Sequence, residues 1–142
     1  MVTNCQQEVS VRKRILLLIP VLAIGMMLVS SCNRSAMKGP GSPDDPVVVL
    51  ETTEGDIFVQ LFAAEAPEGV DNFLEYVKSG FYDGLIFHRV IDGFVIQGGG
   101  YDADLNKKET RESIANEATN GLRNLRGTLS YARTDDVNSA TS

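Results

Sequence analysis

Apolar and polar residues alternate in the part of the chain that follows residue 46. Residues 47–52 form a short apolar, β-branched run, which is typical of a strand. Glu54 and Gly55 then provide a turn, and apolar side chains occupy every second position of residues 56–62. The pattern predicts a β-hairpin, because two such runs are joined by only a short turn.

The period of the pattern then changes from two residues to that of a helix. Pro67 suits the first turn, where its missing N–H leaves no hydrogen bond unmade. The following apolar residues lie at helical spacing: Val70, Phe73, Leu74 and Val77. Such a stripe predicts a helix that packs on a core rather than a binding surface. We expect Gly80 to end it as a C-terminal cap.

Two more strands are predicted after the helix. Residues 85–90 and 94–97 are rich in apolar side chains and are the predicted strands, and Asp92 and Gly93 join them as a turn. We expect the three glycines at 98–100 to end the second of these strands.

The remainder of the chain is more polar. Residues 101–124 are long for a connection and are expected to run over the surface. Residues 127–132 (GTLSYA) predict one further strand. Together these elements indicate a single, mainly β domain over residues 47–142.

The start of the chain has the three parts of an export signal. Residues 12–14 are basic, residues 15–29 are apolar, and the small Ser30 and Ser31 precede Cys32. The apolar run has about 15 residues, whereas a transmembrane helix needs roughly 20, so the pattern favours a signal over a membrane span.

The end of this segment, LVSSC at residues 28–32, resembles the lipobox of bacterial lipoproteins. The resemblance implies that residues 1–31 are a signal peptide and that lipidated Cys32 becomes the mature N-terminus. The alternative is an ordinary secretory signal with a cysteine nearby. Residues 32–46 are rich in Gly, Pro, Ser and Asp, and we expect a flexible tether. We therefore expect the protein to be anchored to a lipid bilayer through Cys32, with its domain facing the periplasm or the cell exterior.

Composition excludes several classes of function. The chain has 13 basic and 19 acidic residues and a net charge of −6, so no nucleic-acid partner is expected. With His88 as the single histidine, a zinc site has little support, and we expect neither a metal nor a cofactor. Ser130 lacks the context of a nucleophile elbow, and the glycines at 98–100 lack the Lys-Ser/Thr of a phosphate loop.

Three blocks carry a resemblance to a known family. Residues 87–99 (FHRVIDGFVIQGG) resemble the central signature of the cyclophilins. Residues 116–118 (NEA) and 126–133 (RGTLSYAR) resemble the following blocks of that family, and Asn72-Phe73 in the expected helix also fits. The resemblance covers residues 47–142.

The resemblance implies a cyclophilin-like closed antiparallel β-barrel with capping helices. It implies catalysis of cis/trans rotation at X-Pro bonds of proline-containing polypeptides, without a cofactor. It places Arg89, Phe94 and Gln97 at catalytic positions, and Ala132 and Arg133 on the strand that pairs with the substrate backbone. Arg133 stands where another polar residue is common in the family.

The chemistry of X-Pro rotation explains why Arg, Phe and Gln side chains suit such a site. The barrier of roughly 18–20 kcal/mol comes from amide conjugation, so a fixed cation near the prolyl nitrogen accelerates rotation. Arg89 can supply that cation, Phe94 an apolar seat for the ring and Gln97 contacts to the substrate backbone. Without the family match, Arg89 is a solvated strand residue and Phe94 a core aromatic. On a flat strand Phe94 and Gln97 face opposite sides, so a twist or bulge near Gly98 is required.

The resemblance also implies that the C-terminal strands and second helix of the barrel are absent from this chain. We therefore expect a monomeric isomerase for exported proteins, in a form that lacks its closing strands. The alternative is a non-catalytic proline-peptide-binding module or chaperone, or an inactive fragment.

Overall fold

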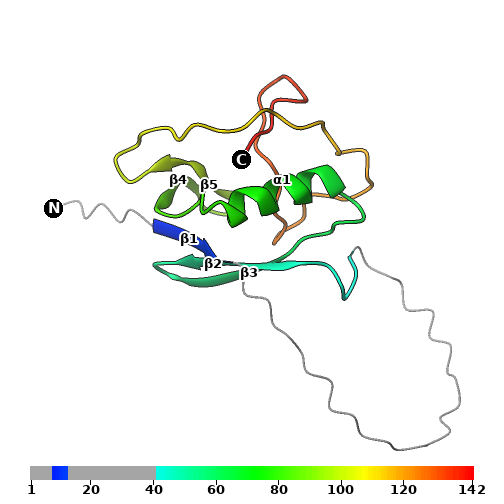
Figure 1. Cartoon of the computed structure of the whole chain (residues 1–142), viewed down its shortest axis with the longest axis horizontal. Coiled ribbons are helices and arrows are strands. Elements are labelled where there is room, and N and C mark those ends of the chain that lie inside the picture. The colour runs from blue at the N-terminus through cyan, green and yellow to red at the C-terminus, as the bar shows by residue number, and fades with distance from the viewer. Residues whose placement is uncertain (1–7, 13–40) are drawn as a thin grey trace, which may run out of the picture.

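A computed structural model describes residues 8–12 and 41–142 of the chain. One helix and five strands occur in these residues (Figure 1). They are β1 (Glu8–Arg12), β2 (Val47–Thr52), β3 (Gly55–Gln60), α1 (Pro67–Lys78), β4 (Leu85–Ile91) and β5 (Val95–Asp102). The predictions of the first hairpin, the helix and the β4–β5 pair are therefore confirmed.

The strands form one antiparallel sheet in the order β3-β2-β1-β4-β5. The closed barrel expected from the sequence is not found in the described residues, because β3 and β5 each have only one neighbour. After Asp102 the described chain forms no further strand that could pair with either edge. The protein is mainly β, but this sheet is open.

The central strand, β1, comes from the N-terminal segment that the sequence assigns to the export signal. It pairs with β2 from Val9↔Thr52 to Arg12↔Val49, and with β4 at Glu8↔Ile86 and Val9↔Leu85. β1 thus joins the β2–β3 hairpin to the β4–β5 hairpin. The other residues of the expected signal and Cys32 lie outside the described residues. The described part contains no helix of the length and apolarity that a membrane span requires.

Helix α1 lies against one face of the sheet (Figure 1), and its buried side chains belong to both hydrophobic core clusters. Its predicted apolar stripe is confirmed, since Val70, Leu74 and Val77 are buried. Phe73 packs against both of the core clusters. The first cluster contains Tyr76, Val77, Phe81, Tyr82 and Leu85, and the second contains Val48, Leu61, Val70 and Leu74. Gly80, with φ of +67°, follows the helix in the left-handed conformation expected of a cap.

Two strand predictions need correction. The glycines at 98–100 do not end β5, which continues to Asp102, because the irregular β4–β5 register absorbs the extra residues. Residues 127–132 form no strand, since no described strand lies beside them to complete a ladder. Instead, Thr128 N–H donates to the Leu125 carbonyl in a turn, and the Tyr131 side chain packs on α1.

The described end of the expected tether, residues 41–46, is hydrogen-bonded to the domain. Asp45 accepts from the backbone N–H of Ala63 at 3.3 Å, and Gln60 donates to the Ser42 carbonyl at 2.8 Å. Leu61 N–H donates to the Pro46 carbonyl at 2.9 Å. These bonds fix the entry of the chain into β2.

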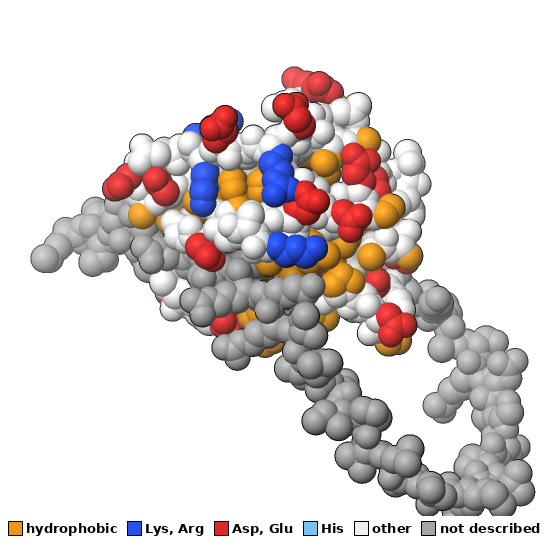
Figure 2. Space-filling model, in the orientation of Figure 1, with side chains coloured by type: hydrophobic (Ala, Val, Ile, Leu, Met, Phe, Trp, Pro, Cys, Tyr) orange, Lys and Arg blue, Asp and Glu red, His pale blue; other side chains and the backbone are white. Residues whose placement is uncertain are grey.

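The chain after β5 wraps around the helix and ends close to it (Figure 1). On the face drawn in Figure 2, acidic side chains are scattered over the surface, with apolar side chains exposed between them. This agrees with the net charge of −6.

Candidate functional site

The β4–β5 hairpin brings two of the expected catalytic residues together. Arg89 and Gln97 are directly opposite each other across the two strands. The Arg89 Nη1 donates to the Gln97 Oε1 at 3.2 Å. Phe87 pairs with Gly98, so β4 has one more residue than β5 in this interval, and His88 is the residue of the bulge. An irregularity is therefore present near Gly98, but it lies on β4 and does not change the three-residue step from Phe94 to Gln97.

Phe94 lies in the turn before β5 and not on the strand. Its N–H donates to the Ile91 carbonyl at 3.1 Å, and its side chain is 75% exposed. The alternation of side chains along a strand therefore does not determine where the Phe94 ring points. For this reason, the three-residue step from Phe94 to Gln97 does not predict whether the two side chains face the same side.

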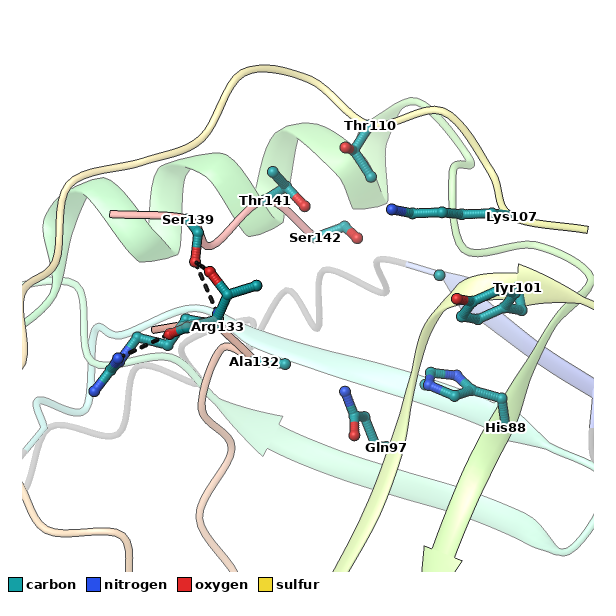
Figure 3. A pocket seen from close by; sticks show the side chains of 13 residues that line it. His88, Gln97, Tyr101, Lys107, Thr110, Ala132, Arg133, Ser139, Thr141 and Ser142 are labelled. Carbon is teal, nitrogen blue, oxygen red and sulfur yellow. Dashed lines mark hydrogen bonds between the residues drawn. The ribbon is translucent and has the colours of Figure 1, made fainter. Parts of the chain in front are cut away.

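A cavity of about 360 Å³ lies beside this hairpin (Figure 3). Of the five expected site residues, it brings together Gln97, Ala132 and Arg133. Arg89 is connected to it through Gln97, and neither Arg89 nor Phe94 belongs to its lining. The space lies between β5 and the C-terminal segment of the chain.

The guanidinium of Arg133 is directed away from this cavity in Figure 3. Its Nη1 donates to the carbonyl of the neighbouring Thr134 at 3.0 Å. Thr134 in turn bonds to the Ser139 hydroxyl through its N–H at 2.8 Å and through its own hydroxyl at 2.9 Å. The loop from 133 to 139 is therefore held by its own polar groups, and Ala132 and Arg133 are both exposed.

Helix α1 holds the segment that carries these residues. Tyr131, directly before Ala132, donates its hydroxyl to the Gly69 carbonyl at 2.8 Å. Asn72 Nδ2 donates to the Tyr131 hydroxyl at 3.2 Å and to the Thr141 carbonyl at 2.7 Å. Burial raises the pKa of Tyr131 to about 12, although the Asn72 hydrogen bond acts in the opposite direction. Tyr131 therefore stays protonated and able to donate at neutral pH.

The first turn of α1 is capped from a distant part of the chain. Ala66 at the N-cap offers no side-chain acceptor. The Glu117 carboxylate instead accepts from the N–H groups of Glu68 at 3.1 Å and Gly69 at 2.8 Å. A negative charge at this end also suits the helix dipole. In the sequence, Asn72 and Glu117 stand out only as parts of blocks that resemble the family. Their contacts could not be predicted, because each joins positions far apart in the chain.

His88 lines both the main cavity and a smaller one of about 280 Å³. Its ring packs on the edge of Tyr101 at 4.7 Å between centroids, and its buried Nδ1 has no described hydrogen-bond partner. Burial, and then the charge of Arg89, lower the pKa of His88, so the imidazole is neutral at pH 7. In the described residues no three His, Cys, Asp or Glu side chains gather as a metal site.

Comparison with known proteins identifies the family of the chain. Residues 47–142 match the model of a family described as cyclophilin type peptidyl-prolyl cis-trans isomerase/CLD. The chain therefore belongs to the cyclophilin-type peptidyl-prolyl cis-trans isomerase family.

Several relatives are bacterial isomerases. The chain is 56% identical over 95 residues to peptidyl-prolyl cis-trans isomerase A of Dickeya dadantii, covering 67% of this chain and 50% of that protein. It is 54% identical over 95 residues to peptidyl-prolyl cis-trans isomerase B of Escherichia coli, covering 67% and 58%. It is 56% identical over 94 residues to the isomerase cyp18 of Streptomyces antibioticus, covering 66% and 57%. The chain spans about half the length of the curated relatives that it matches.

Proposed function

We propose that this protein is a peptidyl-prolyl cis-trans isomerase that acts on X-Pro bonds of polypeptides. The observation that carries the proposal is the cross-strand pair of Arg89 and Gln97 next to an open cavity. Family membership supports the same reaction. Rotation breaks no bond, so the site requires no nucleophile and no redox group.

Arg89 is the group that stabilises the twisted amide. When conjugation is lost, the prolyl nitrogen gains lone-pair character and accepts a hydrogen bond. A guanidinium has five N–H donors in a rigid plane, and one of them is used on Gln97. The Gln97 oxygen thus orients the guanidinium while the other N–H groups stay available to the substrate. The interaction strengthens as the amide twists, which is the condition for catalysis.

The other site residues bind the substrate in this proposal. The exposed ring of Phe94 supplies apolar surface for the proline ring, and the backbone at Ala132 and Arg133 contacts the peptide. The Gln97 amide N–H₂ is free to donate to the substrate carbonyl, since its oxygen already accepts from Arg89. Water is displaced from around Arg89 on binding, which strengthens its field.

The test is the rotation rate of a short X-Pro peptide, measured by NMR exchange. Arg89→Ala is expected to lower kcat/KM by about 100-fold or more, because a preorganised donor to the developing charge is lost. Arg89→Lys keeps the charge without the planar fork and is expected to be intermediate. Arg123→Ala removes an exposed arginine outside the cavity lining and serves as the matched control. An Arg89→Ala protein with unchanged rates would show that the mechanism is wrong.

Peptide binding separates catalysis from the alternative of a non-catalytic proline-peptide-binding module or chaperone. If Arg89 acts on the transition state, its removal spares most of the ground-state affinity while the rotation rate falls. A wild-type protein that binds the peptide without accelerating rotation would favour the binding module.

We further propose that the protein is an exported lipoprotein anchored through Cys32. The support is the basic, apolar and small-residue order of residues 12–31 and the LVSSC sequence before the expected tether. Several acyl chains would hold the protein firmly at a bilayer, at about 0.8 kcal/mol for each buried methylene. The intact mass of the membrane-extracted protein tests this: an unmodified cysteine at position 32 would rule out the anchor.

A further inference from the structure

The charge of the main cavity differs from that of the whole molecule. Acidic residues outnumber basic ones by 19 to 13 in the chain, yet no Asp or Glu side chain is among the described residues that line the cavity. Lys107 and Arg133 are its charged side chains at neutral pH. A site of this charge in an acidic protein attracts negative groups selectively.

Lys107 is the cation that points into this space. In Figure 3 its ammonium extends over the cavity from the side opposite Arg133, whereas the Arg133 guanidinium turns outward and bonds to Thr134. His88 adds no charge at neutral pH, because its pKa is lowered. Lys107 therefore sets the charge that a bound peptide meets on the β5 side.

The backbone fixes the position from which the Lys107 side chain starts. Lys107 forms an isolated β-bridge with Tyr101. On one side of it, Asp102 closes a turn by accepting from Asn106 N–H at 2.8 Å and from Asn106 Nδ2 at 3.0 Å. On the other side, Lys108 N–H donates to the Gly100 carbonyl at 2.9 Å.

Two charged residues close to Lys107 in sequence, Asp102 and Lys108, do not take over this role. The Asp102 carboxylate is used inside the turn, and hydrogen bonds from Asn106 lower its pKa. The Lys108 ammonium bonds to the Phe81 carbonyl and lies 4.8 Å from the Phe81 ring centroid. Lys107 has the same charge but is directed to the cavity.

We propose that Lys107 is a specificity-determining residue that makes the site prefer X-Pro segments with an acidic side chain directly before the proline. The proposal rests on the isomerase function proposed for the same site. An exposed ion pair contributes modestly, so the expected preference for Glu-Pro over Gln-Pro is about threefold to fivefold at low salt. Added salt reduces that ratio toward one, because the pair is open to solvent.

The test uses two peptides that differ only in Glu or Gln before the proline. Affinity is measured by fluorescence anisotropy, and rotation by NMR exchange, for the full chain. Lys107→Gln is expected to bring the Glu/Gln ratio of affinities to about one, because affinity for the Glu-Pro peptide falls by more than affinity for the Gln-Pro peptide. Lys78→Gln makes the same charge change at the exposed end of α1, away from the cavity, and is expected to keep the wild-type ratio.

The outcomes distinguish this proposal from the isomerase function. Equal affinities of the wild type for both peptides, or a ratio that persists in Lys107→Gln, would overturn the role of Lys107 even if rotation is fast. A Lys107-dependent affinity ratio without any rotation would support the charge preference and overturn the isomerase function. Failure to bind either peptide would overturn both.

Discussion

Two tyrosines in the same aromatic cluster differ in how their hydroxyl groups are satisfied. Tyr76 and Tyr82 are 1% and 6% exposed, and their ring centroids are 5.9 Å apart. The Tyr76 hydroxyl accepts from the Arg111 backbone N–H at 2.7 Å. The Tyr82 hydroxyl is buried without a hydrogen-bond partner among the described residues. Burial, with smaller contributions from Tyr131 and Tyr76, raises the pKa of Tyr82 far above its usual range.

Replacing each tyrosine by phenylalanine is expected to change stability in opposite directions. Tyr82→Phe removes an unsatisfied buried hydroxyl and is expected to raise the free energy of unfolding by about 1 kcal/mol. Tyr76→Phe leaves the Arg111 N–H without its acceptor and is expected to lower it by about 1 kcal/mol. Urea unfolding of the two variants measures both effects. A stabilised Tyr76→Phe protein would contradict this description of the cluster.

At the scale of elements, α1 is a platform for the C-terminal segment that borders the cavity. Asn72 is the link, because its amide bonds both to the Tyr131 hydroxyl and to the Thr141 carbonyl. The helix therefore determines where Ala132 and Arg133 stand relative to β5.

Asn72→Ala is expected to loosen that segment without unfolding the helix. Loss of the hydrogen bonds, at about 1 kcal/mol each, predicts roughly fivefold or greater acceleration of hydrogen exchange for amides of residues 131–142. Exchange in the buried face of α1 stays the same. Asp71→Ala, at the exposed neighbouring position, is the control and leaves both regions unaffected. Equal exchange in the two variants would argue against the link.

Elements with a strong local pattern could be predicted from the sequence. The apolar stripe at helical spacing correctly predicted α1, and the Glu54-Gly55 turn correctly predicted the β2–β3 hairpin. The strand expected at residues 127–132 was wrong, because a strand also needs a neighbour, and sequence alone does not show one. The pairing of Arg89 with Gln97 depends on the bulge at His88, which periodicity does not encode.

At the scale of the whole molecule, the sheet depends on a strand from the start of the chain. β1 lies between β2 and β4, and it is the element that connects the two hairpins through backbone hydrogen bonds. The pairing of Glu8 with Ile86 joins positions that are distant in sequence. The sequence assigned this segment to an export signal, so its strand was not predicted.

Removing β1 is expected to destabilise the full chain strongly. Deletion of residues 1–12 removes the pairing to both hairpins and is expected to lower the free energy of unfolding by at least about 3 kcal/mol, since several backbone hydrogen bonds are lost. Deletion of residues 1–7 spares β1 and is the matched control. Coinciding urea midpoints for the two deletions would show that β1 does not support the sheet.

Because β1 is the central strand of the sheet, folding and secretion compete for the same residues of the chain. On the export proposal, Glu8–Arg12 belongs to the leader that must stay extended and accessible to the secretion machinery, and cleavage before Cys32 separates it from the domain. In the folded precursor the same five residues are enclosed between two other strands. If the precursor folds before secretion, residues 8–12 are therefore paired in the sheet and are not accessible to the secretion machinery. If it is secreted and cleaved before it folds, β2 and β4 lack β1 as a pairing partner.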